Sequence, residues 1–375
     1  MRTEARTQHG SSFAARIAPL FAGLVLALVC SACGDDLPKA TLITHMRMVG
    51  GRTEVKGDEM RSTPKPGETA VVTFAMAYPK VDQDDSVLSS MFITCSEPKQ
   101  FTGTPICQEL IDLATTSGDA GAGTGSGAAA LPKSLSCKGL EDSVLPPVLP
   151  GVTASCVTGT PKIDVPIEAK SKLAKKLIRG IICRNGTPAI NLENEQLFEC
   201  HRNAGVKASD YEALAVYGTV PIEHDADSTN QNPSFTDATF KRRTKVWPAE
   251  ATPVPAMDDD CLDAAQMGLM PLTDGRDEEI VISYPANVRE KRDGKPETIE
   301  LSAYATAGEL DRRFIVFEPD AKPMGGKLEN SWKWKLTSDE RLDIKKTGKL
   351  VRFIFTILDR EGGFDVTQRS LCVQK

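Results

Sequence analysis

Ten cysteines are the residues whose possible chemistry the sequence limits most closely. Two of them, Cys30 and Cys33, follow a short apolar run near the N-terminus. Thiols can accept a lipid, bind zinc, attack a substrate or pair as disulfides, and their spacing and surroundings distinguish these uses. The other eight are spread over the rest of the chain: Cys95, Cys107, Cys137, Cys156, Cys183, Cys200, Cys261 and Cys372.

The N-terminal segment has the pattern of an export signal. Three arginines precede thirteen apolar residues at 17–29. This run suits the core of a signal peptide, and it is short for a spanning helix, which needs about 20 residues. Two small residues, Ser31 and Ala32, then stand directly before Cys33. We therefore expect residues 1–32 to be a signal peptide.

The residues Ser31-Ala32-Cys33 resemble the bacterial lipobox. The resemblance implies that the Cys33 thiol receives a diacylglycerol, that the chain is cut before it, and that the new amino group takes an acyl chain such as palmitate. Cys30 departs from the family, which prefers leucine there. Each buried methylene contributes about 0.8 kcal/mol, so two or more chains hold a protein stably to a membrane. An ordinary secretory signal with a coincidental cysteine is the alternative.

The residue after the cysteine bears on which membrane is expected. Aspartate at that position resembles an inner-membrane retention signal of enteric bacteria, whereas this chain has Gly34. Gly34 favours the outer membrane, with the protein on its periplasmic leaflet or at the cell surface. Asp35 and Asp36 follow closely and leave the inner membrane open.

The chain is acidic, which limits its partners. The net charge of −6 includes three arginines and one glutamate in residues 1–32, so residues 33–375 carry −6 − 2 = −8. Nucleic-acid binding needs clustered cations, and this composition argues against it. We expect contact with the membrane through the lipid anchor, and an envelope protein or a glycan as the partner.

An even number of cysteines in an exported chain predicts a set of disulfides. The sequence alone leaves the pairing open. A zinc site is less favoured, because residues 33–375 hold no C-x-x-C and only three histidines. The preferred pairing joins sequential cysteines: Cys95–Cys107, Cys137–Cys156, Cys183–Cys200 and Cys261–Cys372.

Asp225, Asp227 and Asn230 carry the metal-site hypothesis. Calcium takes carboxylate and amide oxygens, and an ion in a segment between two domains would stiffen it. The run D-A-D-S-T-N lacks the glycine and the distal glutamate of an EF-hand loop. A solvated acidic loop is the alternative. Apart from this structural calcium, no cofactor is expected.

The sequence offers no catalytic motif. It has no G-x-S-x-G elbow, its histidines are scattered, and its exported cysteines are expected to be paired. We therefore expect a non-catalytic binding, adhesion or structural role. An exported hydrolase or glycan-processing enzyme is the alternative, because the spacing of catalytic carboxylates is a three-dimensional property.

Short β-forming runs between proline and glycine turns predict an all-β fold of sandwich type. In the N-terminal half these runs are 41–49, ending at Gly50-Gly51, then 69–77, 90–95 and 214–222. One segment differs: at 167–182, apolar residues with helical spacing alternate with lysines, which predicts a basic amphipathic helix. A low-complexity loop is expected at 115–130.

The C-terminal half has a clearer strand pattern. Residues 298–306 alternate, so that Ile299, Leu301 and Ala303 are expected on one face of a strand and Glu300 and Ser302 on the other. The expected strands are 280–284, 298–305, 314–317, 331–336, 350–358 and 368–373.

These patterns predict two β-sandwich domains. The first carries an insertion that is rich in loops and partly helical. The expected boundaries are a signal peptide at 1–32, a tether at 33–39, the first sandwich at 40–224, a linker at 225–232 and the second sandwich at 233–375.

Several of these segments together resemble bacterial envelope lipoproteins of a myxobacterial type. The resemblance implies a lipid anchor followed by immunoglobulin-like (Ig-like) β-sandwich modules, and it supplies no catalytic residue to transfer. Fold similarity of this kind does not specify a function. The segments are Cys33-Gly34-Asp35-Asp36, Pro66-Gly67-Glu68-Thr69, 230–233, 297–308, Trp334 and 351–363.

Overall fold

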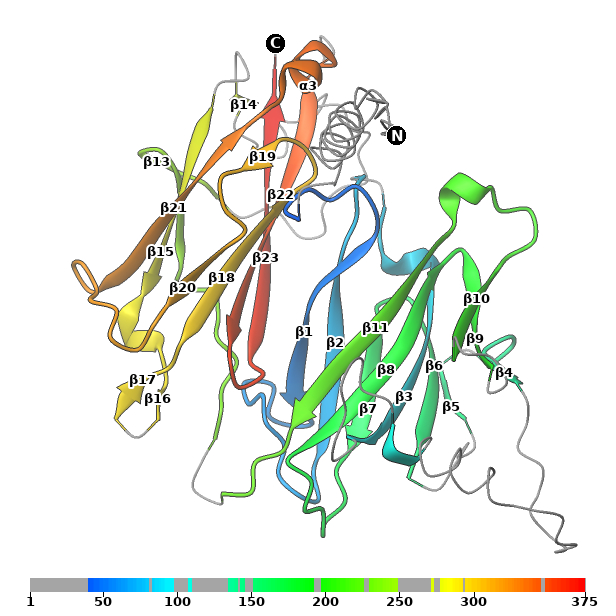
Figure 1. Ribbon diagram of the computed structural model, residues 1–375. Coiled ribbons are helices and arrows are strands. Elements are labelled where there is room, and N and C mark those ends of the chain that lie inside the picture. The colour runs from blue at the N-terminus through cyan, green and yellow to red at the C-terminus, as the bar shows by residue number, and fades with distance from the viewer. Residues whose placement is uncertain are drawn as a thin grey trace, which may run out of the picture. The chain divides into compact units, whose positions relative to one another are not determined.

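The computed structural model describes residues 40–80, 83–97, 107–109, 134–140, 142–145, 151–191, 197–225, 229–248, 271–272, 277–292, 294–344 and 348–374. The chain divides into two units, residues 1–39 and 40–375, and all described residues belong to the second. Nearly all regular structure in them is antiparallel β-sheet, as the sequence predicts (Figure 1).

Two five-stranded sheets form a sandwich in the C-terminal half. One has the order β13-β12-β15-β21-β19, with β12 at Thr239–Arg242, β13 at Lys245–Val246, β15 at Glu278–Pro285, β19 at Glu309–Leu310 and β21 at Lys327–Lys335. The other has the order β14-β23-β22-β18-β20, with β14 at Pro271–Leu272, β18 at Ile299–Ala305, β20 at Phe314–Phe317, β22 at Lys349–Asp359 and β23 at Phe364–Val373. β14 pairs in parallel with β23.

Alternation along β18 produces the buried face that the sequence predicts. Ile299, Leu301 and Ala303 are at most 1% exposed and belong to one large core. Glu300 lies on the opposite face and is only partly buried. Side chains in a strand alternate between its two faces, so a shift of the strand's register by one residue would turn the whole apolar row away from the core.

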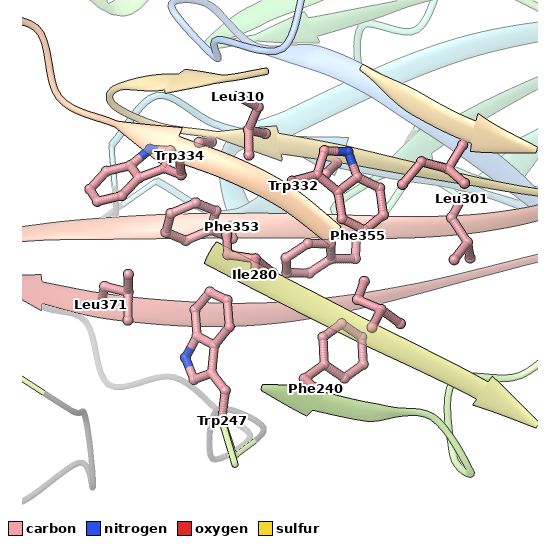
Figure 2. Close-up of a cluster of buried hydrophobic side chains, with 14 of the residues drawn as sticks. Phe240, Trp247, Ile280, Leu301, Leu310, Trp332, Trp334, Phe353, Phe355 and Leu371 are labelled. Atoms are coloured by element: carbon pink, nitrogen blue, oxygen red, sulfur yellow. The ribbon is translucent and has the colours of Figure 1, made fainter. Parts of the chain in front are cut away.

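Aromatic rings fill the core of the C-terminal sandwich (Figure 2). Trp332 and Trp334 of β21 are fully buried and pack edge-on against Phe355 and Phe353, with ring centroids 6.2 and 5.3 Å apart. Trp247 packs against the same two phenylalanines. Such pairs contribute about 0.5–1.5 kcal/mol each beyond their area burial, so this core holds much of the stability.

The N-terminal half forms a second sandwich with an additional layer. One sheet is β1-β2-β7, with β1 at Arg47–Val55, β2 at Thr69–Ala77 and β7 at Lys162–Pro166. The facing sheet is β11-β8-β3-β6-β5, with β3 at Leu88–Ser96, β5 at Ser143–Val144, β6 at Thr153–Thr158, β8 at Lys175–Arg184 and β11 at Glu212–Pro221. The additional sheet is β10-β9-β4, with β4 at Ser134–Ser136, β9 at Gly186–Asn191 and β10 at Phe198–Arg202.

The helix predicted at 167–182 is wrong, because the second half of this segment, from Lys175 onward, belongs to β8, an interior strand of its sheet, and the first half contains no helix. Ile178 and Ile182 face the core shared with β2, while Leu177 and Ile181 face the additional layer. A strand buried on both faces shows a nearly continuous apolar run, which periodicity alone does not distinguish from a helix. Gly180 lies inside β8, where a Cβ would collide with the carbonyl oxygen of Met91 and the ring of Phe92.

The two glycines expected to end the first strand lie inside β1 instead. The register between β1 and β2 shifts at Met48 and Gly50. A Cβ on Gly50 would overlap the ring of Phe364, a residue of the C-terminal sandwich. Glycine is therefore present because another part of the molecule approaches the strand closely, and not because the strand ends.

Both sandwiches use the same chain path. Numbering the seven main strands of each in chain order, one sheet has the order first-second-fifth and the other seventh-sixth-third-fourth. These are β1-β2-β7 with β11-β8-β3-β6, and β12-β15-β21 with β23-β22-β18-β20. The order corresponds to strands A-B-E and G-F-C of an Ig-type sandwich, as expected for Ig-like domains.

Short elements complete the described structure. The helix α3 (Ser338–Leu342) begins with a capping box, in which Thr337 and Glu340 bond to each other's main-chain N–H. The other short elements are the hairpin of β16 (Lys291–Arg292) and β17 (Lys295–Pro296) and the 3₁₀ turns η2 (Asp85–Val87), η3 (Ala208–Asp210) and η5 (Ala286–Val288).

Candidate functional sites in the sandwich scaffold

Three disulfides attach neighbouring segments to the five-stranded sheet of the N-terminal sandwich, and two of them join it to the additional layer, through Cys200 of β10 and through Cys137, which directly follows β4. Cys95 of β3 bonds to Cys107, Cys137 to Cys156 of β6, and Cys183 of β8 to Cys200 of β10. The predicted sequential pairing is therefore confirmed for these six cysteines.

The disulfides are part of a small core rather than of a reactive site. All but Cys200 are at most 5% exposed, and they pack with Met91, Ile93 and Leu177. The bridges close loops of 12 to 19 residues, and closing a loop of this size stabilises a fold by about 3 kcal/mol in chain-entropy models. They compensate for a layer too thin to bury a large core of its own.

Two other expected sulfur sites involve residues outside the described part of the chain. Cys372 of β23 is fully buried and disulfide-bonded. Its expected partner, Cys261, is not among the described residues, and neither is the expected lipidation site Cys33.

One of the predicted calcium ligands lies in a buried hydrogen-bond network. Asn230 is fully buried, and its Nδ2 donates to Ser62 Oγ at 2.6 Å and to Asp359 Oδ2 at 3.1 Å. Asp225 is exposed, and its main-chain N–H donates to Glu223. Asp227 lies outside the described residues. Ser62 precedes β2 and Asp359 ends β22, so Asn230 connects the two sandwiches directly.

Asn232 makes a second connection of the same kind. Its Nδ2 donates to the carbonyl of Thr53 in β1 at 2.8 Å, and its Oδ1 accepts the N–H of Phe364 in β23 at 3.0 Å. Asn232 is 4% exposed. Residues 230–232, at the end of the predicted polar linker 225–232, are thus held between the sandwiches by the side-chain amides of Asn230 and Asn232.

An arginine from β1 extends this junction to the β22–β23 hairpin. Arg52 donates to the carbonyl of Phe364 at 3.2 Å and lies 3.6 Å from Asp365. Asp365 in turn accepts the main-chain N–H of Phe235 at 2.7 Å. Within the hairpin, Asp359 Oδ1 accepts the N–H groups of residues 361 and 363, which holds the turn in place.

The apolar part of the junction involves the start of the described chain. The main-chain N–H of Ile43 donates to the carbonyl of Ala305 in β18 at 2.9 Å, so this segment pairs with the C-terminal sandwich. Ile43 and Val49 share a buried cluster with Tyr304 and Ile354 on the outer face of the C-terminal sandwich. Residues 41–43, expected in the first domain, therefore pair with the second sandwich.

A carboxyl group with unusual surroundings lies near the hairpin. Glu297 is 9% exposed; its Oε1 accepts the N–H of Glu290, and its Oε2 is buried without a hydrogen-bond partner among the described residues. Burial, together with the nearby carboxylates of Asp359, Glu290 and Glu361, raises the pKa of Glu297 to about 7. A raised pKa is typical of catalytic acids, but it also occurs in structural clusters.

Two grooves lie on the described surface, and Glu297 lines neither. The first, of about 390 Å³, lies between β1–β2 and the β22–β23 hairpin. Phe74, Ile354 and Val366 form its apolar wall, and Arg52 and Gln368 form its polar rim. Arg52 is already bonded to Phe364, so this groove belongs to the junction.

The second groove, of about 620 Å³, opens on the side of the N-terminal sandwich. It lies between β7, the last strand of one sheet, and β5–β6 at the margin of the other. Val144, Val157 and Ile163 provide apolar walls, and Asp142 and Lys162 lie at the rim. A groove of this size suits a short peptide or a small molecule.

Among the described residues, one group of three potential metal ligands lies close together: Cys95, Cys107 and Glu109. The two sulfurs form a disulfide, and Glu109 accepts the main-chain N–H of Ser96 at 3.1 Å. These atoms are therefore structural partners of one another.

Sequence reasoning missed the junction residues Asn232, Asp359 and Arg52. A signal was present in the run 229–233, because an asparagine pair before a proline favours an extended chain with side-chain hydrogen bonds.

In the part of the chain that the structure describes, no helix has the length and apolar character needed to cross a membrane. No protein-family model matches the chain, and no curated protein matches it.

Proposed function

We propose that the protein is a lipid-anchored envelope protein, similar to the myxobacterial-type lipoproteins with Ig-like modules, and that its role is non-catalytic. In this proposal, Cys33 carries acyl chains in the outer membrane, and the two sandwiches form a stiff module that binds an envelope protein or a glycan. The three disulfides support export, because disulfides persist in oxidising compartments.

The observation that carries the proposed role is the junction built on Asn230 and Asn232. Each side chain is buried and bonds to both sandwiches, so relative motion of the sandwiches would break hydrogen bonds in a buried place. An unmade buried hydrogen bond costs about 1–3 kcal/mol. A stiff module loses less conformational entropy on binding, which favours display of a binding surface.

The anchoring is tested by metabolic labelling with an alkyne analogue of palmitate, followed by detergent phase partition. We expect the native chain to be labelled and to enter the detergent phase, whereas Cys33→Ala is unlabelled and soluble. Cys30→Ala is the matched control and remains labelled. Equal labelling of Cys33→Ala would contradict the proposal.

The binding role is tested by co-sedimentation of the purified chain with peptidoglycan sacculi and with outer-membrane vesicles that lack this protein. We expect saturable binding to one of them without release of soluble glycan or peptide fragments. Time-dependent release of fragments would replace the non-catalytic role by the hydrolase that the sequence leaves open. Binding to neither would contradict the proposed role.

A further inference from the structure

The free edge of β7 presents main-chain groups to the second groove. At one end of the strand, the carbonyl of Pro161 accepts the N–H of Phe74 in β2 at 2.9 Å. At the other, the N–H of Ile167 donates to the carbonyl of Glu68 at 2.9 Å. Along an antiparallel strand, the main-chain groups of every second residue bond to one neighbouring strand, and those of the residues between them point to the opposite side. The odd-numbered residues 161–167 therefore bond to β2.

It follows that the N–H and C=O groups of Lys162 and Asp164 and the C=O of Pro166 point away from β2. β7 is the last strand of its sheet, and no described strand lies on that side. The side chains of Lys162 and Asp164 are exposed, and Asp164 lies 3.1 Å from Lys56 on the outer face of the sheet. The carboxylate is thus held away from the free edge.

The C-terminal sandwich shows what occupies the equivalent position there. Its fifth main strand, β21, corresponds to β7, and the short strand β19 lies on the outer edge of β21. Leu310 of β19 pairs antiparallel with Trp334. Its side chain is 7% exposed and belongs to the sandwich core. A two-residue extended segment with one apolar side chain therefore closes that side of the sandwich.

We propose that the β7 edge binds an extended peptide segment of a partner protein, which adds to the sheet as a strand. This inference rests on the proposed binding role and names the class of partner. The segment donates to and accepts from Lys162 and Asp164, and an apolar side chain enters the groove between Ile163 and Val157. It occupies the place that β19 occupies in the other sandwich.

The groove also indicates the composition of the segment. Its rim carries two lysines and two aspartates, Lys56, Lys162, Asp142 and Asp164, so its net charge is zero and it favours an uncharged segment. Pro166 has no N–H, so this end of the strand offers only a carbonyl to the segment. Exposed charged side chains on an edge strand also hinder aggregation through pairing with the edge strands of other molecules.

The first test is hydrogen exchange of the full-length chain in detergent micelles. We expect the amides of Lys162 and Asp164 to exchange freely while those of Ile163 and Val165 are protected. Protection of Lys162 and Asp164 in the free chain would show that the protein's own residues or a second copy cover the edge, and would overturn the proposal. A sedimentation measurement would identify the second copy.

The second test uses a fluorescent five-residue peptide of alternating valine and threonine as the probe. We expect saturable binding that slows exchange at Lys162 and Asp164, and no binding by the same peptide with methylated main-chain nitrogens. Asp164→Pro removes an outward N–H without touching the pairing with β2, and it should weaken binding about tenfold, which corresponds to one hydrogen bond. Asp164→Asn keeps that N–H and is the control.

Equal binding of the methylated peptide, or unchanged affinity of Asp164→Pro, would overturn strand addition, as would the absence of binding to the native chain. Neither peptide result depends on Cys33, sacculi or vesicles. Failure at the β7 edge therefore leaves the proposed envelope role standing. Loss of anchoring or of envelope binding in the earlier tests would in turn leave the peptide affinity unchanged.

Discussion

The two sandwiches have the same strand order but different means of stabilisation. The C-terminal sandwich has one thick core of tryptophan and phenylalanine rings. The N-terminal sandwich has two thinner cores, one on each face of the sheet that contains β8, and three disulfides across the outer one. Disulfides in one sandwich and buried aromatic rings in the other therefore stabilise two domains with the same strand order.

The outer face of the seventh-sixth-third sheet is covered differently in each sandwich. In the N-terminal sandwich, the additional layer of β4, β9 and β10 covers it. In the C-terminal sandwich, part of that face contacts the other sandwich: Tyr304 and Ile354 are buried against Ile43, Val49 and Ala77. The first sandwich thus supplies its own cover, and the second obtains one from its neighbour.

Removing a ring from the aromatic core is the strongest test of the comparison. Trp334→Ala leaves a large cavity beside Phe353 and should lower the free energy of unfolding by about 3–5 kcal/mol. Chemical denaturation measures the loss. Phe314→Ala is the control, because Phe314 is 50% exposed on an edge strand, and its effect should be small. Equal losses would mean that the ring cluster is not the main source of stability.

Removing a disulfide should act on the other sandwich. The double variant Cys137→Ala/Cys156→Ala should lose about 3 kcal/mol, because a closed loop of 19 residues is released in the unfolded chain. Thermal unfolding with far-ultraviolet detection measures it. Near-ultraviolet signals of the buried tryptophans should keep their native shape below the transition. Their early loss would show that the bridge also supports the C-terminal core.

The buried carboxyl of Glu297 should make the stability depend on pH. Its pKa is about 7 in the folded chain and about 4.5 in an unfolded one, so the folded state binds the extra proton between these values. Stability should therefore fall as pH rises from about 4.5 to 7, by up to about 3 kcal/mol.

Glu297→Gln should remove this slope and stabilise the protein at pH 8, as measured by denaturation midpoints at several pH values. Glu279→Gln, at an exposed position, is the matched control and should keep the native slope. A variant at Glu297 with the same pH dependence as the native chain would assign the slope to other groups.

The smallest effect is expected at the junction. Asn232→Ala removes the bonds to Thr53 and Phe364 and should cost about 2 kcal/mol, because a buried N–H and a buried carbonyl lose their partner. The two sandwiches should then unfold in separate steps, seen by calorimetry. Gln231→Ala, at an exposed neighbouring position, should unfold as the native chain does. A single transition in Asn232→Ala would show that the apolar contacts suffice.

Sequence reasoning succeeded where apolar and polar residues alternate along a strand. The alternation in 298–306 predicted β18 and its buried row, and the cysteine order predicted three disulfides. It failed at 167–182, because the additional layer buries the second face of β8 and removes the alternation. It also misread Gly50, since the reason for that glycine is Phe364, more than three hundred residues away.

The sequence by itself determined the strand type of most segments, the parity of the buried rows and the set of cysteines available for pairing, because these depend on local periodicity and on residue chemistry. Only the tertiary structure decided that Asn230 and Asn232 join two sandwiches and that Glu297 shares its surroundings with Asp359. It also decided that the edge of β7 faces an open groove. These properties depend on which distant segments meet, and a hydrogen bond or a desolvated charge acquires its energy only from such neighbours.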